Sequence, residues 1–210
     1  MYQGQLKGYL DDLAGKKPAP GGGSAAACSA ALGVSLLSMV ANFTLGKEKY
    51  KAYEAQVKAA LAESEDLRQQ LLLLVDKDVA VYKKVASAYK LPKESDEDKR
   101  KRSAQIEKAL KEALTAPFEV CKCSHQAVKL CPLLAEKGNI NLISDVGVAL
   151  VLLHSAFQSA LLNVEINLNG IKDKEFIVKV RKALDPLEEE VGAVRGELWP
   201  VLKGKIKISQ

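Results

Sequence analysis

The sequence predicts an all-α protein, a single domain over residues 1–210 built as a bundle of about six helices. Hydrophobic residues make up 48% of the chain and are mostly alanine, leucine and valine, which favour helix together with abundant lysine and glutamate. There are only 7 prolines to interrupt helices. No segment alternates convincingly between apolar and polar residues, and the short tail KIKIS is the only candidate strand.

The first two helices are separated by a glycine-rich break. Three leucines share one face of a short amphipathic helix expected over residues 3–14. Residues 15–23 interrupt the pattern. The second helix is expected to begin at Ser24, whose hydroxyl can cap free amide groups, and to end near Gly46.

This second helix has an alternative interpretation as a membrane span. Residues 24–45 read SAAACSAALGVSLLSMVANFTL, which is 22 residues without a charge and long enough to cross a bilayer. Small residues dominate it, Asn42 interrupts it, and we find no second such segment. A central helix in a bundle of helices, close to its neighbours, is the favoured interpretation.

The remaining helices follow from breaks in the pattern. Residues 47–90 contain neither glycine nor proline and are expected to form one helix, stopped by Pro92. Ser95 and three acidic residues begin the next helix, with a kink expected at Pro117. Residues 137–145 form a polar break.

Two helices complete the bundle. The first spans residues 146–169, with Ser144 or Asp145 as its cap, and is nearly free of charge. The two nearly charge-free helices are expected at the centre of the bundle or at a dimer interface. A last helix begins near Asp173 and is expected to break or kink at its prolines, Pro186 and Pro200.

Charge and cysteine usage limit the class of protein. The net charge of +5 is spread over both signs, so it indicates neither a nucleic-acid nor a membrane partner, and polyanionic small molecules fit it equally well. With no signal peptide in the sequence, we expect a cytoplasmic protein with reduced thiols. The spacing of the potential metal ligands does not match a zinc site: Cys121, Cys123, His125 and Cys131.

Asp78 is the first candidate for chemistry. Steps of three and four residues from Leu71 along the third helix reach Asp78 and Tyr82, so this carboxyl group lies on the apolar stripe, whereas Asp76 lies off its centre. A carboxyl group there loses solvation and its pKa rises, which suits proton transfer near neutral pH. The alternative is a structural aspartate that caps a loop or pairs with a basic residue.

Two asparagine-rich stretches are further candidates. Asn139 and Asp145 belong to the polar break GNINLISD, which also suits a simple turn and cap. Asn163 and Asn167 lie one turn apart on an apolar helix and need hydrogen-bond partners if buried. They fit either a pair that contacts a ligand or a polar contact between helices.

The glycine run at residues 21–23 precedes a helix. It matches neither a P-loop nor a dinucleotide-binding loop, because no strand precedes it and the spacing differs. Exposed amides at a helix N-terminus, reached by backbone without side chains, bind anions or carbonyl oxygens. The residues alone therefore predict an all-α ligand-binding protein.

Five motifs in order extend this interpretation: APGGGSAAA, MVANFTLGKEKY, LVDKDVAVYKKVASAYKLPK, KGNINLISDVGVA and NVEINLNGIKD. Together they resemble the cyclodeaminase/cyclohydrolase family of folate enzymes over nearly the whole chain. The resemblance implies an all-α homodimer whose substrate is a tetrahydrofolate carrying a one-carbon unit, with a polyglutamate tail as an option, and no metal or redox cofactor.

The resemblance also implies roles for individual residues. The catalytic aspartate of the family falls on the LVDKD motif, which we assign to Asp78, with Asp76 as second choice. Residues expected to approach, position or contact the folate are Gly21, Gly22, Gly23, Ser24, Asn139, Asp145, Asn163 and Asn167, with Lys47 and Lys49 expected at its glutamate tail.

The chain carries no formiminotransferase domain, which favours methenyltetrahydrofolate cyclohydrolase over formiminotetrahydrofolate cyclodeaminase. A non-catalytic folate-binding or assembly module is the third interpretation.

Overall fold

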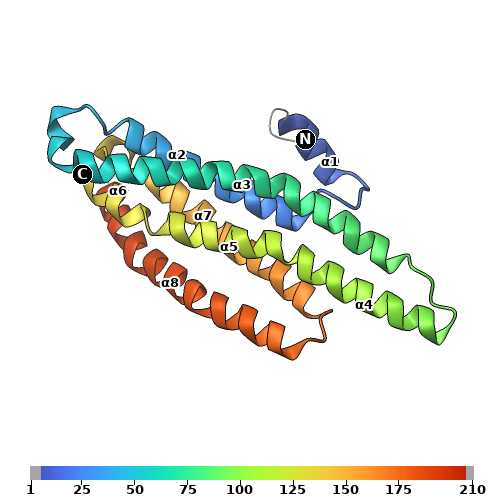
Figure 1. Cartoon of the computed structure of the whole chain (residues 1–210). Helices are drawn as coiled ribbons and strands as arrows, with labels where there is room; N and C mark the ends of the chain where they lie inside the picture. The colour runs from blue at the N-terminus through green and yellow to red at the C-terminus, as the bar shows by residue number, and fades with distance from the viewer. Residues whose placement is uncertain (1–5, 207–210) are drawn as a thin grey trace.

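The computed structural model describes residues 6–206, and that range contains helices and no strand (Figure 1). The α-helices are α1 (Leu6–Ala14), α2 (Gly22–Asn42), α3 (Glu54–Tyr89), α4 (Asp96–Ala113), α5 (Thr115–Val128), α6 (Cys131–Lys137), α7 (Ile143–Leu168) and α8 (Lys174–Ile206), with the 3₁₀ helices η1 (Glu48–Tyr53) and η2 (Ile140–Leu142). Six of the α-helices are 14 residues or longer, which confirms the predicted all-α bundle.

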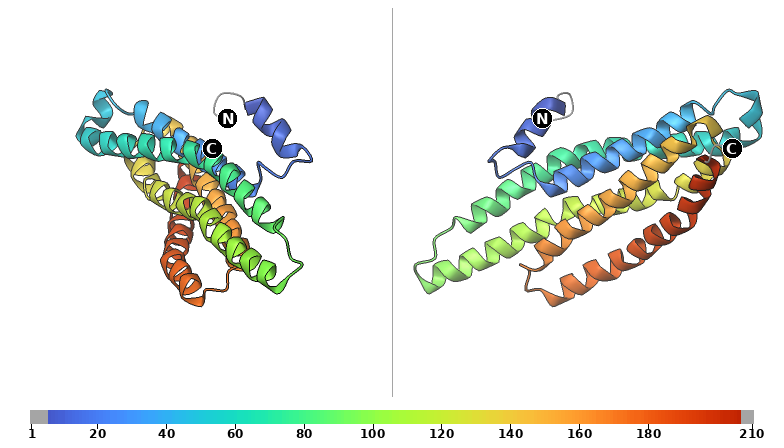
Figure 2. Two further views of the ribbon diagram at one scale, coloured as in Figure 1. Left: turned by 45° about the vertical axis from the view of Figure 1, so that its right-hand side comes forward. Right: turned by 180° about the vertical axis from the view of Figure 1, so that it is seen from behind.

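The nearly charge-free helices α2 and α7 lie at the centre of the bundle. α2 packs along both α3 and α7, α5 packs along α7, and α8 lies on the outside against α7 and α5 (Figures 1 and 2). α1 lies outside the bundle (Figure 2). Gly33 lets α2 and α7 approach closely, because a Cβ there would lie 2.8 Å from Cγ of Leu153.

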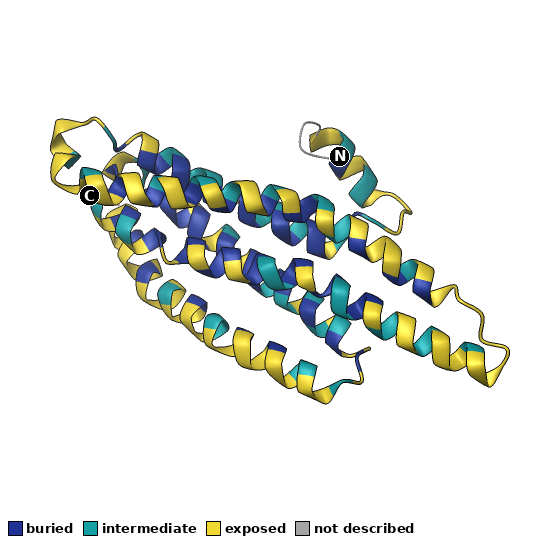
Figure 3. Cartoon of the chain, in the orientation of Figure 1, coloured by how far each residue is buried: buried dark blue, intermediate teal, exposed yellow. Residues whose placement is uncertain are grey.

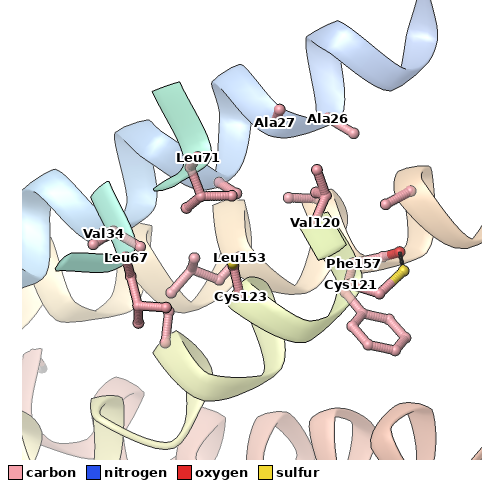
Figure 4. Packing of buried hydrophobic residues seen from close by; sticks show 14 of the residues in the cluster. Ala26, Ala27, Val34, Leu67, Leu71, Val120, Cys121, Cys123, Leu153 and Phe157 are labelled. Carbon is pink, nitrogen blue, oxygen red and sulfur yellow. Dashed lines mark hydrogen bonds between the residues drawn. The ribbon is translucent and has the colours of Figure 1, made fainter. Parts of the chain in front are cut away.

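The core fills the space between these four inner helices. Leu67 and Leu71 of α3 face Val34 of α2, Leu153 of α7 and Val120 of α5, and all five are buried (Figure 4). The outward faces of α3 and α8 and the far end of α4 are mostly exposed (Figure 3). The apolar stripes predicted from the sequence therefore meet in one shared core.

Two segments are long and apolar enough to cross a membrane, α2 and residues 140–168, which corrects the expectation that no second segment exists. In their most apolar windows 61% and 44% of the residues are buried inside the bundle. Both helices therefore use much of their apolar surface for packing against other helices of the chain.

The start of α2 differs from the prediction. The helix begins at Gly22, two residues before the expected Ser24, and Gly21 at the cap position is extended. Gly21 has no side chain with which to cap this end. The Ser24 hydroxyl instead forms a buried hydrogen bond with the Tyr9 hydroxyl at 3.2 Å, which ties α1 to the first turn of α2.

The prolines act differently from the prediction. The kink expected at Pro117 appears as a break between α4 and α5 at Leu114, because proline has no N–H to donate to the carbonyl four residues earlier. α8 continues through Pro186 and Pro200 as one curved helix, where breaks or kinks were expected (Figure 1). Both prolines are exposed, so water can satisfy the carbonyl groups that they leave unpaired.

The other helix ends agree only partly with expectation. Ser95 forms a capping box with Asp98, as the acidic start predicted. Residues 48–53 form η1 before α3 begins at Glu54, so the expected helix over residues 47–90 is divided. α7 begins at Ile143, which places Ser144 and Asp145 inside its first turn; neither caps it.

Candidate active site

A cavity of about 240 Å³ lies where the N-terminal end of α2 meets the C-terminal parts of α3, α4 and α7. It is lined by residues from four helices and the loop before α2: Pro18, Ala19, Gly21, Gly22, Gly23, Asp78, Val81, Tyr82, Val85, Ala113, Asn163, Ile166 and Asn167. Six of the twelve predicted site residues are in this set.

Asp78 lies against the backbone of α2. A Cβ added to Gly23 would lie 2.2 Å from Oδ1 of Asp78 and 2.7 Å from its Cγ, so only glycine leaves room for this carboxyl group. Burial raises the pKa of Asp78 above its ordinary value, and a hydrogen bond from the Ser24 amide lowers it in part. A carboxyl group with a raised pKa beside a cavity is suited to moving a proton.

The first turn of α2 supplies hydrogen-bond donors to the same place. The Ala25 amide makes the first helical bond, to the Gly21 carbonyl at 3.0 Å. The amides of Gly22, Gly23 and Ser24 therefore have no partner within their own helix, and Asp78 accepts from that of Ser24. The positive end of the helix dipole and a carboxylate thus lie together at the cavity wall.

Asn163 and Asn167 form the opposite wall, on α7. A Cβ on Gly22 would lie 3.4 Å from Nδ2 of Asn163, so this asparagine packs against the start of α2. Each amide donates to the carbonyl four residues earlier on its own helix: Asn163 to Ser159 at 2.8 Å and Asn167 to Asn163 at 2.7 Å. The structure thus brings Asn163 and Asn167 to the same cavity as Asp78.

Sequence reasoning did not assign site roles to Tyr82 and Ile166, which form the exposed apolar rim of the cavity. Tyr82 is 44% exposed and Ile166 is 67% exposed. Tyr82 lies one helical turn after Asp78, and Ile166 lies three residues after Asn163. Helical spacing from the predicted polar residues was a signal that could have identified both.

Two predicted residues lie near the cavity but outside its lining. Ser24 is fully buried beneath it and bonded to Tyr9. Asp76, the second choice for the catalytic aspartate, is partly buried on α3 and does not line the cavity. The geometry therefore favours Asp78 of the two aspartates.

The four remaining residues lie at the other end of α2. Lys47 and Lys49 are exposed beyond its C-terminus, about 30 Å along the helix from Gly22. Asp145 precedes Asn163 by about 27 Å on the axis of α7. Within one chain, these residues are not brought to the cavity.

Asn139 has a structural environment at that end. Its amide nitrogen donates to the Phe43 carbonyl at 3.1 Å, and its backbone N–H donates to the Thr44 hydroxyl at 2.8 Å. Its side-chain oxygen accepts from the Asn141 amide at 3.2 Å, which caps η2. These bonds join the end of α2 to the start of η2.

A larger groove, of about 950 Å³, lies between α3 and α4. Four lysines line it, and its one carboxylate, Glu112, forms an ion pair with Lys84. The smaller cavity differs because it holds a partly buried carboxyl group, Asp78, whose pKa is raised by burial. The smaller cavity is therefore the better candidate for the reaction.

Comparison with known proteins connects this geometry to one family. Residues 5–186 match the sequence profile of the formiminotransferase-cyclodeaminase family. A methenyltetrahydrofolate cyclohydrolase of Methylorubrum extorquens is 42% identical over 201 residues, which is 96% of this chain and 97% of that protein. A formimidoyltransferase-cyclodeaminase of Rattus norvegicus is 30% identical over 190 residues, 90% of this chain but only 35% of that longer protein.

A solved structure agrees with the fold. The crystal structure of a formiminotetrahydrofolate cyclodeaminase from Thermotoga maritima superposes with a TM-score of 0.88 at 33% identity, covering 96% of this chain and 97% of that one. The sequence match and the shared fold confirm the resemblance that the five motifs indicated. The chain belongs to the formiminotransferase-cyclodeaminase family.

Proposed function

We propose that this protein is a methenyltetrahydrofolate cyclohydrolase, which adds water to 5,10-methenyltetrahydrofolate and gives 10-formyltetrahydrofolate. The observation that carries the proposal is the 42% identity to a methenyltetrahydrofolate cyclohydrolase over nearly the full length of both chains. The cavity beside Asp78 supports it with a group able to move protons.

The reaction requires two proton transfers next to one carbon. Water attacks the methenyl carbon, and the carboxylate of Asp78 takes one of its protons. The bond between this carbon and N5 then breaks. N5 receives the proton from Asp78, while the new hydroxyl group loses its proton to solvent and becomes the formyl oxygen. The cationic substrate thus gives a neutral folate ring system and releases one proton overall.

The position of Asp78 suits this role. Its raised pKa lets the carboxyl group hold a proton between the two steps, and the Ser24 amide keeps it in place. Gly22 and Gly23 line the same cavity, and their backbone amides are hydrogen-bond donors that can stabilise negative charge that develops on oxygen.

A second candidate is formiminotetrahydrofolate cyclodeaminase. The structural match to the Thermotoga maritima cyclodeaminase covers nearly the full length of both chains and supports it. In that reaction N10 attacks the formimino carbon on N5 and ammonia leaves. The same proton-moving carboxyl group would serve, so the substrate decides between the two activities.

The test is to offer the protein 5,10-methenyltetrahydrofolate and 5-formiminotetrahydrofolate separately and follow the methenyl absorbance. Faster loss of the signal than in buffer alone supports the cyclohydrolase. A gain of signal with ammonia release would instead identify a cyclodeaminase. No turnover of either substrate would leave a non-catalytic folate-binding or assembly module.

The same assay tests the catalytic residue. Asp78→Asn keeps the shape of the side chain but removes its base, so turnover is expected to fall by at least about 100-fold while folate still binds. Near-normal turnover would contradict the assignment. Asp76→Asn, two residues away and outside the cavity lining, is the matched comparison and is expected to retain activity.

We also propose that the protein acts as a homodimer in the cytoplasm. Large apolar side chains on α7 are exposed, including Val148, Leu162 and Ile166, and Leu32 on α2 is 56% exposed. Covering such residues with a second copy would remove apolar surface from water. The four cysteines are all unpaired, which fits a reducing compartment. Sedimentation at micromolar concentration tests the dimer, and a monomer would contradict it.

A further inference from the structure

The amide groups of Asn163 and Asn167 have a fixed orientation. Each donates to a backbone carbonyl of α7, and a carbonyl can only accept, so Nδ2 must face the helix and Oδ1 must face away from it. Neither Oδ1 atom has a hydrogen-bond partner within residues 6–206. The α7 wall of the cavity therefore presents two acceptors, one helical turn apart.

Contacts set the order of polar groups along the cavity. Asp78 contacts Gly23, Gly22 contacts Asn163, and Asn167 lies one turn further along α7. From α3 to α7 the wall thus offers a proton-moving carboxyl group, backbone donors, and two side-chain acceptors.

The pterin ring of a tetrahydrofolate carries the complementary series on one edge. N5, where the one-carbon unit is attached, is followed by the 4-oxo acceptor, the N3–H donor and the 2-amino donor. With N5 toward Asp78, the 4-oxo group falls at the α2 amides and the two donors fall at the asparagines. The reversed ring would place its donors against the α2 donors and leave the asparagine oxygens unpaired, which is costly.

We propose that Oδ1 of Asn163 accepts the pterin N3–H and Oδ1 of Asn167 accepts the 2-amino group, so that the pair turns the N5 edge of the ring toward Asp78. This proposal rests on the proposed function, because it takes a tetrahydrofolate as the ligand. In this arrangement the two asparagines are specificity-determining residues, because they select the 2-amino-4-oxo pattern of the pterin ring.

Ligand analogues test each hydrogen bond separately. The parent ligand is the stable 5-formyltetrahydrofolate. A 2-desamino-2-methyl analogue lacks the donor assigned to Asn167, and a 4-amino analogue has no hydrogen on N3 for Asn163. Dissociation constants are measured by calorimetry for the wild type, Asn163→Ala and Asn167→Ala. Asn169→Ala, which removes an exposed amide outside the cavity, is the matched control.

The expected result is a specific coupling between residue and ligand group. Asn167→Ala should weaken binding of the parent ligand by about tenfold but leave binding of the 2-desamino analogue unchanged. Asn163→Ala should behave in the same way with the 4-amino analogue, and Asn169→Ala should change neither. Alanine is a strong helix former, so the variants should fold, and circular dichroism verifies this.

If the asparagine variants lost the same affinity for the parent ligand and for the analogue, the proposal would be overturned. Failure of the wild type to bind the parent ligand would overturn it too. Turnover of 5,10-methenyltetrahydrofolate by the wild type separates the two ideas. If turnover persists without the coupling, the ring orientation is wrong and the cyclohydrolase assignment stands. If binding shows the coupling but no folate is turned over, the orientation stands and the proposed reaction is wrong.

Discussion

Asp78 and Gly23 lie on different helices and are 55 positions apart in the sequence, yet the carboxyl group of Asp78 occupies the space where a side chain at Gly23 would lie. A Cβ on Gly23 would lie 2.2 Å from Oδ1 of Asp78, well inside contact distance. Gly21, two residues earlier and also on the cavity wall, has nothing within 4 Å of its Cβ position. Substitutions at these two glycines can therefore be compared directly: a side chain at Gly23 would displace Asp78, and one at Gly21 would not.

Gly23→Ala is expected to reduce turnover by about 100-fold, because the new methyl group displaces the Asp78 carboxyl group by about 1 Å. Gly21→Ala should keep activity within a few-fold of the wild type. Initial rates with saturating 5,10-methenyltetrahydrofolate measure both. Equal activity of the two variants would mean that the position of Asp78 is unimportant.

Asp78→Asn should change how stability depends on pH. Burial raises the folded-state pKa of Asp78 above 3.8, so the folded state binds this proton more tightly than the unfolded state does. The stability that this proton supplies is fully present below the ordinary pKa and is lost as the pH rises through the raised one. The melting temperature of Asp78→Asn relative to wild type should therefore increase from pH 3 to pH 7. A melting-temperature difference that shrinks as the pH rises would contradict this prediction.

Tyr9→Phe should loosen α1. Tyr9 is 3% exposed and Ser24 is fully buried, so removing the phenolic hydroxyl leaves the Ser24 hydroxyl without this bond inside the protein. The expected loss in the free energy of unfolding is about 1–3 kcal/mol, measured by urea denaturation. Tyr89→Phe, at an exposed tyrosine, is the control and should have almost no effect. A similar result for both would indicate that the Tyr9–Ser24 bond contributes nothing.

Gly33→Ala should destabilise the bundle by about 1–3 kcal/mol, because its Cβ would meet Leu153 at 2.8 Å and force α2 away from α7. Gly192→Ala, on the exposed side of α8 with nothing within 4 Å, should instead stabilise by up to about 1 kcal/mol through helix propensity. Thermal unfolding compares the two. A stabilising Gly33→Ala would show that α2 and α7 have room between them.

The spacing of residues along the chain predicted much of the helical structure, because helix periodicity is a short-range property. Steps of three and four residues placed Asp78 on an apolar stripe, and the structure puts its carboxyl group at the cavity. The same spacing could not predict the contact between Asp78 and Gly23, because that contact depends on how α2 and α3 pack. The catalytic and binding roles of these residues stay predictions.

The sequence did not separate Asn139 from Asn163. Both are amides beside apolar helices, and the local pattern suits ligand binding and structural bonding equally well. The structure separates them through contacts distant in sequence: Asn139 is bonded to Phe43 and Thr44, whereas the oxygen of Asn163 has no partner in the described chain.

The continuous α8 shows a different limit of sequence reasoning. Proline usually interrupts a helix, and the sequence cannot tell that Pro186 and Pro200 both face water. Exposure makes the missing hydrogen bonds tolerable, so the helix continues through both residues.

Two glycines within the first turn of α2 have a consequence for protein engineering. Glycine inside a helix is about 1 kcal/mol less favourable than alanine, so a screen for heat resistance would tend to replace Gly22 and Gly23. A Cβ on Gly23 would fill the space that Asp78 needs, whereas one on Gly22 would only touch Asn163. Selection for a robust scaffold and selection for catalysis would therefore favour different residues at position 23, and a thermostabilised variant should be built from sites elsewhere in the bundle.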